Sequence, residues 1–235
     1  MESAETIITG LATLLKGKQS KDSPLCCEDV NSRHSVFRHK LLESRTDTGD
    51  SGQGASSMSY YATIKATDIA DGHGVRVAVF LSGCPHHCPG CFNSEAWDYT
   101  YGQPLTEKTM DEIKSMLDKP YIQGVTLLGG EPLDPKNIET SAQIAAMAKS
   151  LGKDVWVYTG YSFETIRKCA LRFDAFDDLC IGCTRILLNC DVMVDGRFEQ
   201  DLADKRLVFR GSSNQRIIDV QATLASGGDP VLMSF

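Results

Sequence analysis

Three cysteines stand close together in the segment from Gly83 to Asn93, at the spacing Cys84-x3-Cys88-x2-Cys91. Thiolates ligate iron, and three of them on one short loop can each bind one iron of a cubane iron–sulfur cluster. The segment has no fourth cysteine, so the fourth iron would lack a protein ligand and could bind a cofactor directly. The prolines and glycine between the cysteines suit a loop that turns tightly around such a cluster.

Two other interpretations of this loop are open from the residues alone. A zinc knuckle needs four ligands, and His86 or His87 could supply the fourth. Both histidines lie inside the three-residue gap, however, which strains tetrahedral closure. Cysteines that are buried only for packing would not require this spacing. We therefore expect Cys84, Cys88 and Cys91 to ligate a cluster.

A second candidate segment, from Leu127 to Pro132, contains Gly129, Gly130 and Glu131. Two successive glycines let the backbone approach a ligand, and their N–H and C=O groups can pair with an amino-acid moiety. The carboxylate of Glu131 can accept a hydrogen bond from an ammonium group. Taken alone, the segment is also typical of a strand-to-helix turn that ends at a proline. Considered together with the three cysteines, the segment is a suitable binding site for a ligand of the open iron.

Apolar runs alternate with amphipathic segments from residue 59 onward, which predicts an α/β fold. The predicted strands are 75–81, 122–128, 154–159, 186–194 and 207–209, and the predicted helices are 106–117, 137–151 and 162–171. Thr106 and Ser162 are suited to cap the first and last of these helices. Such alternation indicates βα units and a mostly parallel sheet, which binds ligands at the carboxyl ends of its strands. Both candidate segments follow predicted strands and therefore belong at that edge.

The first 57 residues differ in character from the rest of the chain. Residues 46–57 are polar and small and predict a flexible linker. We expect residues 1–57 to form a low-complexity, flexible extension and residues 58–235 to form the folded domain. Two interpretations of the extension stay open: a dispensable segment, or an alternative start of the chain at Met58. Cys26 and Cys27, upstream of His34 and His39, are adjacent and fit no common metal site.

The composition excludes several classes of protein. Among 235 residues, 42% are hydrophobic and 23% are charged, which is typical of a globular protein. The net charge of −7 gives no basic field for binding nucleic acid, and no apolar run is long enough to span a membrane. Nine cysteines, an odd number, and an acidic amino terminus argue against an exported disulfide protein. We expect a cytoplasmic protein with neither nucleic-acid nor membrane partners.

A second group of thiols lies further along the chain. Cys180 and Cys183 form a C-x2-C pair, and Cys190 follows in an apolar run. The pair could hold zinc or a second cluster. We favour a structural role, because a free cysteine in apolar surroundings behaves as a small hydrophobic residue.

On these motifs the sequence resembles the radical S-adenosylmethionine superfamily, through the cysteine spacing and the segment Gly129-Gly130-Glu131-Pro132. Within it, the chain is similar to the activating proteins of anaerobic (class III) ribonucleoside-triphosphate reductases. This narrower similarity extends from about residue 60 to about residue 219. It rests on residues 82–84, 88–93, 97, 156–161, 194–198 and 210–215.

The resemblance implies a partial, open βα barrel with a [4Fe–4S] cluster bound by the three cysteines. The amino and carboxylate groups of S-adenosyl-L-methionine would bind the fourth iron. Gly129, Gly130 and Glu131 would hold the methionine end of that cofactor. Gly90 and Phe92 would lie against its nucleoside, with Phe92 as the candidate to cover adenine.

The resemblance also implies an activity. An electron from the reduced cluster would cleave S-adenosylmethionine to methionine and a 5′-deoxyadenosyl radical, which would take a hydrogen atom from a backbone glycine of the reductase. A low-potential donor such as flavodoxin or ferredoxin would supply the electron. Two alternatives are an activator of another glycyl-radical enzyme, of the pyruvate formate-lyase type, and a non-catalytic iron–sulfur or zinc protein.

Overall fold

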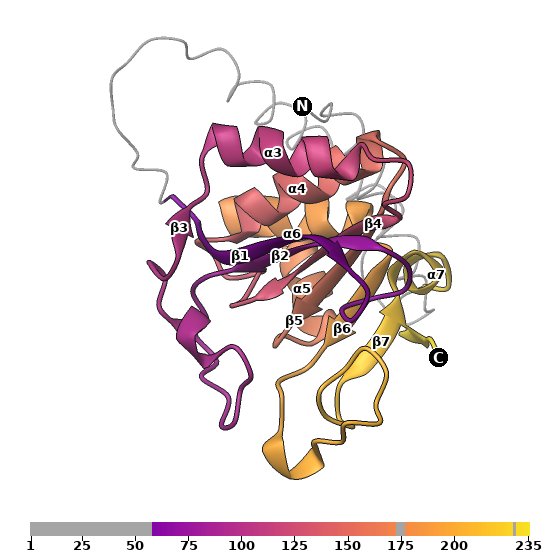
Figure 1. The fold of residues 1–235 in the computed structure, drawn as a ribbon. Coiled ribbons are helices and arrows are strands. Elements are labelled where there is room, and N and C mark those ends of the chain that lie inside the picture. Colours follow the sequence, from indigo (N-terminus) through magenta and orange to yellow (C-terminus); the bar gives the residue numbers. More distant parts are fainter. Residues whose placement is uncertain (1–57, 173–176, 228) are drawn as a thin grey trace.

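A computed structural model describes residues 58–172, 177–227 and 229–235 (Figure 1). The predictions made above for residues 1–57 lie outside these ranges. The strands are β1 (Tyr60–Asp68), β2 (Arg76–Leu81), β3 (Gln103–Pro104), β4 (Gly124–Gly129), β5 (Asp154–Thr159), β6 (Val192–Asp195), β7 (Arg216–Asp219) and β8 (Val231–Leu232). The α-helices are α3 (Glu107–Leu117), α4 (Ile138–Ser150), α5 (Phe163–Ala170), α6 (Asp178–Asn189) and α7 (Val220–Ala225). Two 3-10 helices are η1 (Ser94–Trp97) and η2 (Gln200–Leu202).

The strands form one eight-stranded sheet in the order β3-β1-β2-β4-β5-β6-β7-β8. Its centre, β2-β4-β5-β6, is parallel, and antiparallel strands flank it on both sides. The parallel strands are connected by helices, as βα units require. Their carboxyl ends therefore lie along one edge of the sheet, from which the segments after β2, β4, β5 and β6 leave.

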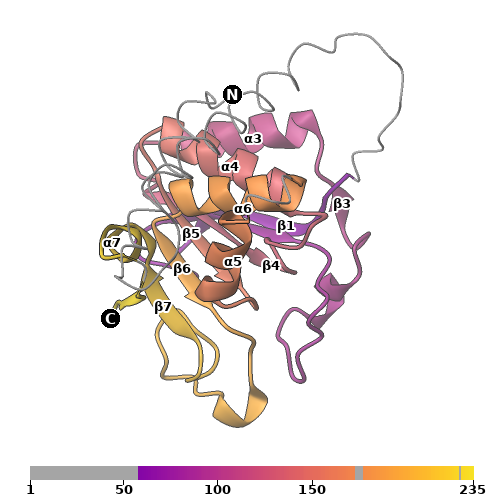
Figure 2. The same cartoon turned by 180° about the vertical axis from the view of Figure 1, so that it is seen from behind.

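The helices pack against one face of the sheet, and α3, α4, α5 and α6 lie together on that side in Figure 2. Alternate strand residues such as Val79, Leu127 and Val157 face them and are fully buried. The opposite face carries a smaller apolar cluster around Trp156, to which Phe209 and Met233 contribute. Because side chains alternate along a strand, the two clusters follow from the strand sequences.

Much of the predicted secondary structure is confirmed. Strand β5 has the predicted bounds, and β2 and β4 lie within two residues of theirs. Thr106 caps α3, where its hydroxyl accepts from the N–H of Thr109, and Ser162 caps α5 in the same way. The helix predicted over 137–151 is α4.

One predicted strand is wrong over its first half, and another is wrong altogether. Residues 178–189 form helix α6, capped by Asp177, so the predicted strand 186–194 is reduced to β6. A short apolar run is compatible with a buried helix as well as with a strand, and here the N-cap Asp177 favours the helix. Residues 207–209 lie in turns, and the strand of this region is β7, which pairs antiparallel with β6.

The expected α/β fold with a parallel centre is confirmed, and its described sheet is open, with β3 and β8 as edges. That this sheet is an open barrel of the radical S-adenosylmethionine type stays a prediction. Across residues 58–172, 177–227 and 229–235, no helix has the length and apolarity that a bilayer crossing needs.

Candidate functional site

The segment Gly83–Asn93, here called the cysteine loop, leaves the carboxyl end of β2. Its cysteines, Cys84, Cys88 and Cys91, are all half-buried free thiols. Helix η1 holds the start of the loop, because the N–H of Gly83 donates to Ala96 (2.8 Å) and that of Cys84 donates to Trp97 (3.2 Å). The loop projects beyond the sheet at the lower end of Figure 1.

The segment Gly129–Pro132, here called the glycine turn, leaves the carboxyl end of β4 and packs on the cysteine loop. A Cβ atom at Gly130 would lie 2.5 Å from the carbonyl oxygen of Gly83. The N–H of Glu131 donates to that same oxygen at 2.8 Å. Gly129 has a φ of +101°, a conformation that side chains disfavour. The two glycines therefore permit a backbone-to-backbone contact between the two candidate segments.

The carboxylate of Glu131 is buried, with 1% of the residue exposed, and has four hydrogen-bond partners in the protein. One oxygen, Oε1, accepts from the N–H of Leu133 (2.9 Å) and the hydroxyl of Thr159 (2.8 Å). The other, Oε2, lies 2.9 Å from Nε2 of His86 and accepts from the N–H of Gly160 (2.8 Å). Each carboxylate oxygen therefore has two protein partners, and the carboxylate joins three segments of the protein.

His86 is the residue of the cysteine loop that reaches this network. Its side chain is 4% exposed and contacts the ring of Tyr161 edge-on, with the ring centroids 4.6 Å apart. A Cβ atom at Gly160 would lie 2.3 Å from the imidazole ring. The absence of a side chain at position 160 therefore makes room for His86.

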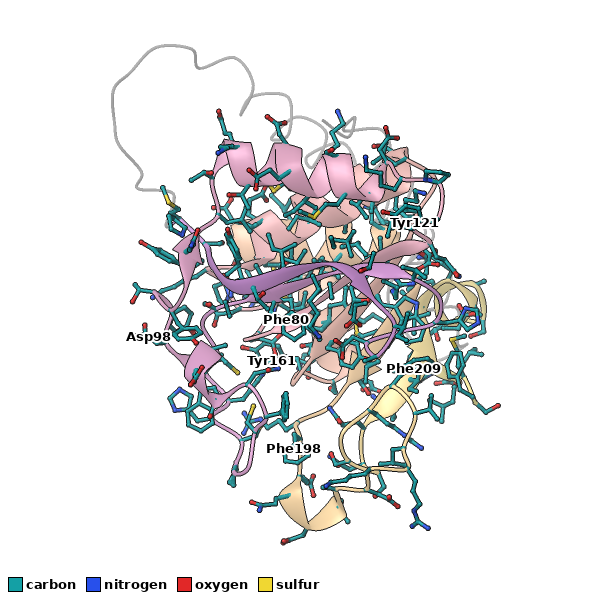
Figure 3. All side chains as sticks on the ribbon, viewed as in Figure 1. Phe80, Asp98, Tyr121, Tyr161, Phe198 and Phe209 are labelled. Carbon is teal, nitrogen blue, oxygen red and sulfur yellow. The ribbon has the colours of Figure 1, made fainter. Side chains whose placement is uncertain are left out.

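The loop between β6 and β7, residues 196–215, also contacts the cysteine loop. Gly90 lies against the side chain of Gln200. The N–H of Phe198 hydrogen-bonds to the Cys88 sulfur, and the positive charge of Arg197 acts on the same thiol. Figure 3 shows Phe198 and Tyr161 at this end of the molecule, below the sheet.

Burial raises the pKa of the Cys84 thiol to about 11 and raises that of Cys88 as well. Backbone N–H groups of His86 and His87 donate to the Cys84 sulfur and partly offset this effect. Iron binds thiolate, so the metal must displace these protons when it binds. The N–H donors would then stabilise the thiolate charge.

The donor set of the cysteine loop consists of three thiols, which are the ligands of an iron–sulfur cluster. In the described ranges, no three His, Cys, Asp or Glu side chains converge on one ion position. The thiolates of a cubane cluster bind three different irons and need not converge. The buried indole N–H of Trp97, whose carbonyl holds Cys84, has no acceptor among the described residues. An unpaired buried donor indicates that an acceptor is missing from this region.

Phe92 is 99% exposed, so its ring is available to a ligand or a partner protein. Trp156 and Tyr158 of β5 belong to the smaller apolar cluster on the opposite face of the sheet, where Trp156 is buried and the Tyr158 hydroxyl donates to the carbonyl of Phe209 (2.9 Å).

The second group of thiols lies between α5 and α6, with Cys169 Sγ 3.7 Å from Cys180 Sγ. Cys180, Cys183 and Cys190 are buried. Burial raises the pKa of Cys180 to about 12 and raises that of Cys183 further. Thiols of this kind are unreactive, which supports the structural role.

Sequence reasoning missed His86, Thr159 and Gly160 as members of one network. The strand β5 and its end were predicted, but nothing in the sequence pairs residue 131 with residues 86 and 160. A signal was present, because a histidine inside a cysteine motif and a glycine at a strand end both lie at the edge where ligands bind.

These features define the class of the protein: an iron–sulfur protein with a three-cysteine loop at the carboxyl edge of a parallel sheet. A family comparison agrees, since the family described as "4Fe-4S single cluster domain" matches residues 70–218.

Curated relatives specify the class further. An anaerobic ribonucleoside-triphosphate reductase-activating protein of Enterobacteria phage T4 is 39% identical over 159 residues, which cover 67% of this chain and 92% of the relative. The protein of that name from Escherichia coli (strain K12) is 41% identical over 152 residues, covering 63% and 90%. That of Haemophilus influenzae is 36% identical over 164 residues, covering 68% and 95%. The chain belongs to this family of activating proteins and carries its 4Fe–4S domain.

Proposed function

We propose that this chain is the enzyme that activates an anaerobic ribonucleoside-triphosphate reductase by reductive cleavage of S-adenosylmethionine. The observation that carries the proposal is the contact between the cysteine loop and the glycine turn at the carboxyl edge of the sheet. Relatives at 35–41% identity bear the name of this activity. On this proposal the sheet is the open βα barrel of the radical S-adenosylmethionine type.

Cys84, Cys88 and Cys91 would hold the [4Fe–4S] cluster. When bound, this cluster supplies the electron that breaks the C5′–S bond of S-adenosylmethionine, giving methionine and the 5′-deoxyadenosyl radical that oxidises a backbone glycine of the reductase. The protein's own part is to bind the cofactor, orient it and exclude water from it.

The backbone of Gly129 and Gly130 would bind the methionine end of the cofactor, and Glu131 shapes that turn. Gly90 and Phe92 would lie against the nucleoside, where an exposed ring can stack on adenine. The electron would come from a low-potential donor such as flavodoxin or ferredoxin.

The test is anaerobic reconstitution with iron and sulfide, followed by reduction and addition of S-adenosylmethionine. We expect 5′-deoxyadenosine and methionine, and a glycyl radical signal in electron paramagnetic resonance when the reductase is added. Cys88→Ala should abolish both the cleavage products and the glycyl radical signal. Cys169 is a half-buried cysteine of α5, and Cys169→Ala should leave both readouts intact. A wild-type protein that binds iron but cleaves no S-adenosylmethionine would refute the proposal.

A further inference from the structure

The pairing of His86 with Glu131 joins two segments that the proposed chemistry needs in contact, 45 residues apart in the sequence. The two side chains are 4% and 1% exposed, so water does not compete for the bond. Because the other three groups at the Glu131 carboxylate are donors, the carboxylate acts as acceptor throughout. We assign the proton of this bond to Nε2 of His86, because a carboxylate can only accept.

The network extends from the cysteine loop to the third strand end. Thr159 and Gly160, at the end of β5, donate to the same carboxylate that hydrogen-bonds to His86. The hydroxyl of Thr159 in turn accepts from the N–H of Tyr161 (3.1 Å), whose ring packs on His86. The segments after β2, β4 and β5 thus share one buried anion.

We propose that His86 and Glu131 are a positioning pair, a proposal that rests on the function proposed above. Their bond sets the position of the cysteine loop relative to the glycine turn, so that the cluster lies within bonding distance of S-adenosylmethionine. Neither side chain needs to touch the cofactor. His86 lies between Cys84 and Cys88 in the sequence, so its imidazole anchors the cysteine loop. Glu131 lies in the glycine turn, and its carboxylate fixes the position of that imidazole. This assigns Glu131 a role through His86 rather than as a ligand of the ammonium group.

Variants of His86 separate positioning from packing. His86→Gln keeps an N–H donor at the same number of bonds from Cα, whereas His86→Leu keeps volume without a donor. His73→Leu makes the same change at an exposed loop residue before β2, at the opposite end of the sheet. All three are reconstituted alongside the wild type, and urea unfolding of each apoprotein reports stability.

We expect His86→Leu to retain bound iron, because its three thiols remain, but to lose S-adenosylmethionine cleavage about 10- to 100-fold, as loss of partners that orient ligands does. The change that the cofactor causes in the electron paramagnetic resonance spectrum of the reduced cluster should weaken in parallel, while His86→Gln restores most of both. The losses caused separately by His86→Leu and Glu131→Gln should multiply to more than the loss in the double variant, because both changes break one shared bond. Glu131→Gln also removes an acceptor from the N–H of Gly160, so the double variant is expected to be worse than His86→Leu alone.

Three results would each overturn the inference. His86→Leu could show the spectra and rates of the wild type, or a stably folded His86→Gln could be as impaired as His86→Leu. The losses in the double variant could also be additive in free energy. Failure of the wild type itself to bind iron or cleave S-adenosylmethionine would instead refute the proposed function. His73→Leu should match the wild type in every readout.

Discussion

Gly130 and Gly83 face each other so closely that a methyl group on Gly130 would lie 2.5 Å from the Gly83 carbonyl oxygen. Real Cβ atoms do not approach an oxygen so closely, so one of the two segments would have to move. The contact brings the start of the cysteine loop onto the glycine turn. Gly129 and Gly130 were expected to let a ligand approach the backbone, and they also let the cysteine loop pack against it.

Gly130→Ala should therefore displace the cysteine loop from the glycine turn. We expect iron binding or S-adenosylmethionine cleavage to fall about 10- to 100-fold, since ligand geometry is lost. Iron analysis and product assay after reconstitution measure this. Gly152→Ala is the matched control: its Cβ would meet nothing within 4 Å, and its φ of +71° should cost stability alone. Equal loss of iron in both variants would contradict the explanation.

Gly160→Ala should reproduce the defect of His86→Leu. The new methyl group would lie 2.3 Å from the imidazole and would push it away from Glu131. Because the two changes break the same bond, the double variant should be little worse than either single one. The comparison uses S-adenosylmethionine cleavage rates of the three reconstituted proteins, and multiplied losses in the double variant would count against it.

Replacing both Cys180 and Cys183 by alanine should leave about four irons per chain after reconstitution, because the cluster is bound elsewhere. The free energy of unfolding of the apoprotein should fall by about 1 to 2 kcal/mol for each substitution, since both side chains are buried. Iron analysis and urea unfolding measure the two effects. A loss of iron on the double substitution would show that these thiols bind metal.

Asp71 should make the stability of the apoprotein depend on pH. Burial, with the nearby charge of Asp68, raises the pKa of Asp71 from 3.8 to about 6. Its carboxyl is neutral in both states at low pH, and the folded state must accept a partly buried charge as pH rises. Stability from this group is therefore present below pH 3.8 and is lost as pH rises through about 6.

Asp71→Asn should accordingly raise the free energy of unfolding near neutral pH by about 1 to 2 kcal/mol, and the gain should vanish below pH about 4. Urea unfolding across this range measures the difference. Asp68→Asn should act in the opposite direction, because the pKa of Asp68 is lowered and its carboxylate accepts from Lys65 and the N–H groups of Ala70 and Asp71. A gain for Asp71→Asn that does not change with pH would refute the assignment.

The sequence predicts the centre of the fold better than its edges. The buried strand β5 and the capped helix α3 have strong local signals, and their predicted bounds hold. Strand β7 escaped prediction because its four residues owe their conformation to pairing with β6. Residues 186–189 were assigned to a strand because an apolar run does not distinguish a strand from a buried helix.

The same division holds at the site. The position of Cys84 after a strand and of Gly129 at the end of the next could be predicted, because each belongs to a local motif. The bond from His86 to Glu131 could not, since it depends on how two strand ends face one another. Contacts between such segments follow from the register of β2 and β4, which pairs Leu81 with Gly129.

The most direct test of the central claim examines how S-adenosylmethionine binds to the reduced, reconstituted protein. Electron–nuclear double resonance with the amino nitrogen of the cofactor isotopically labelled detects a bond between that nitrogen and the cluster. We predict a clear coupling in the wild type that is lost in Cys88→Ala. A reduced wild-type cluster that shows no coupling to the labelled nitrogen would contradict the claim that three cysteines leave one iron open to the cofactor.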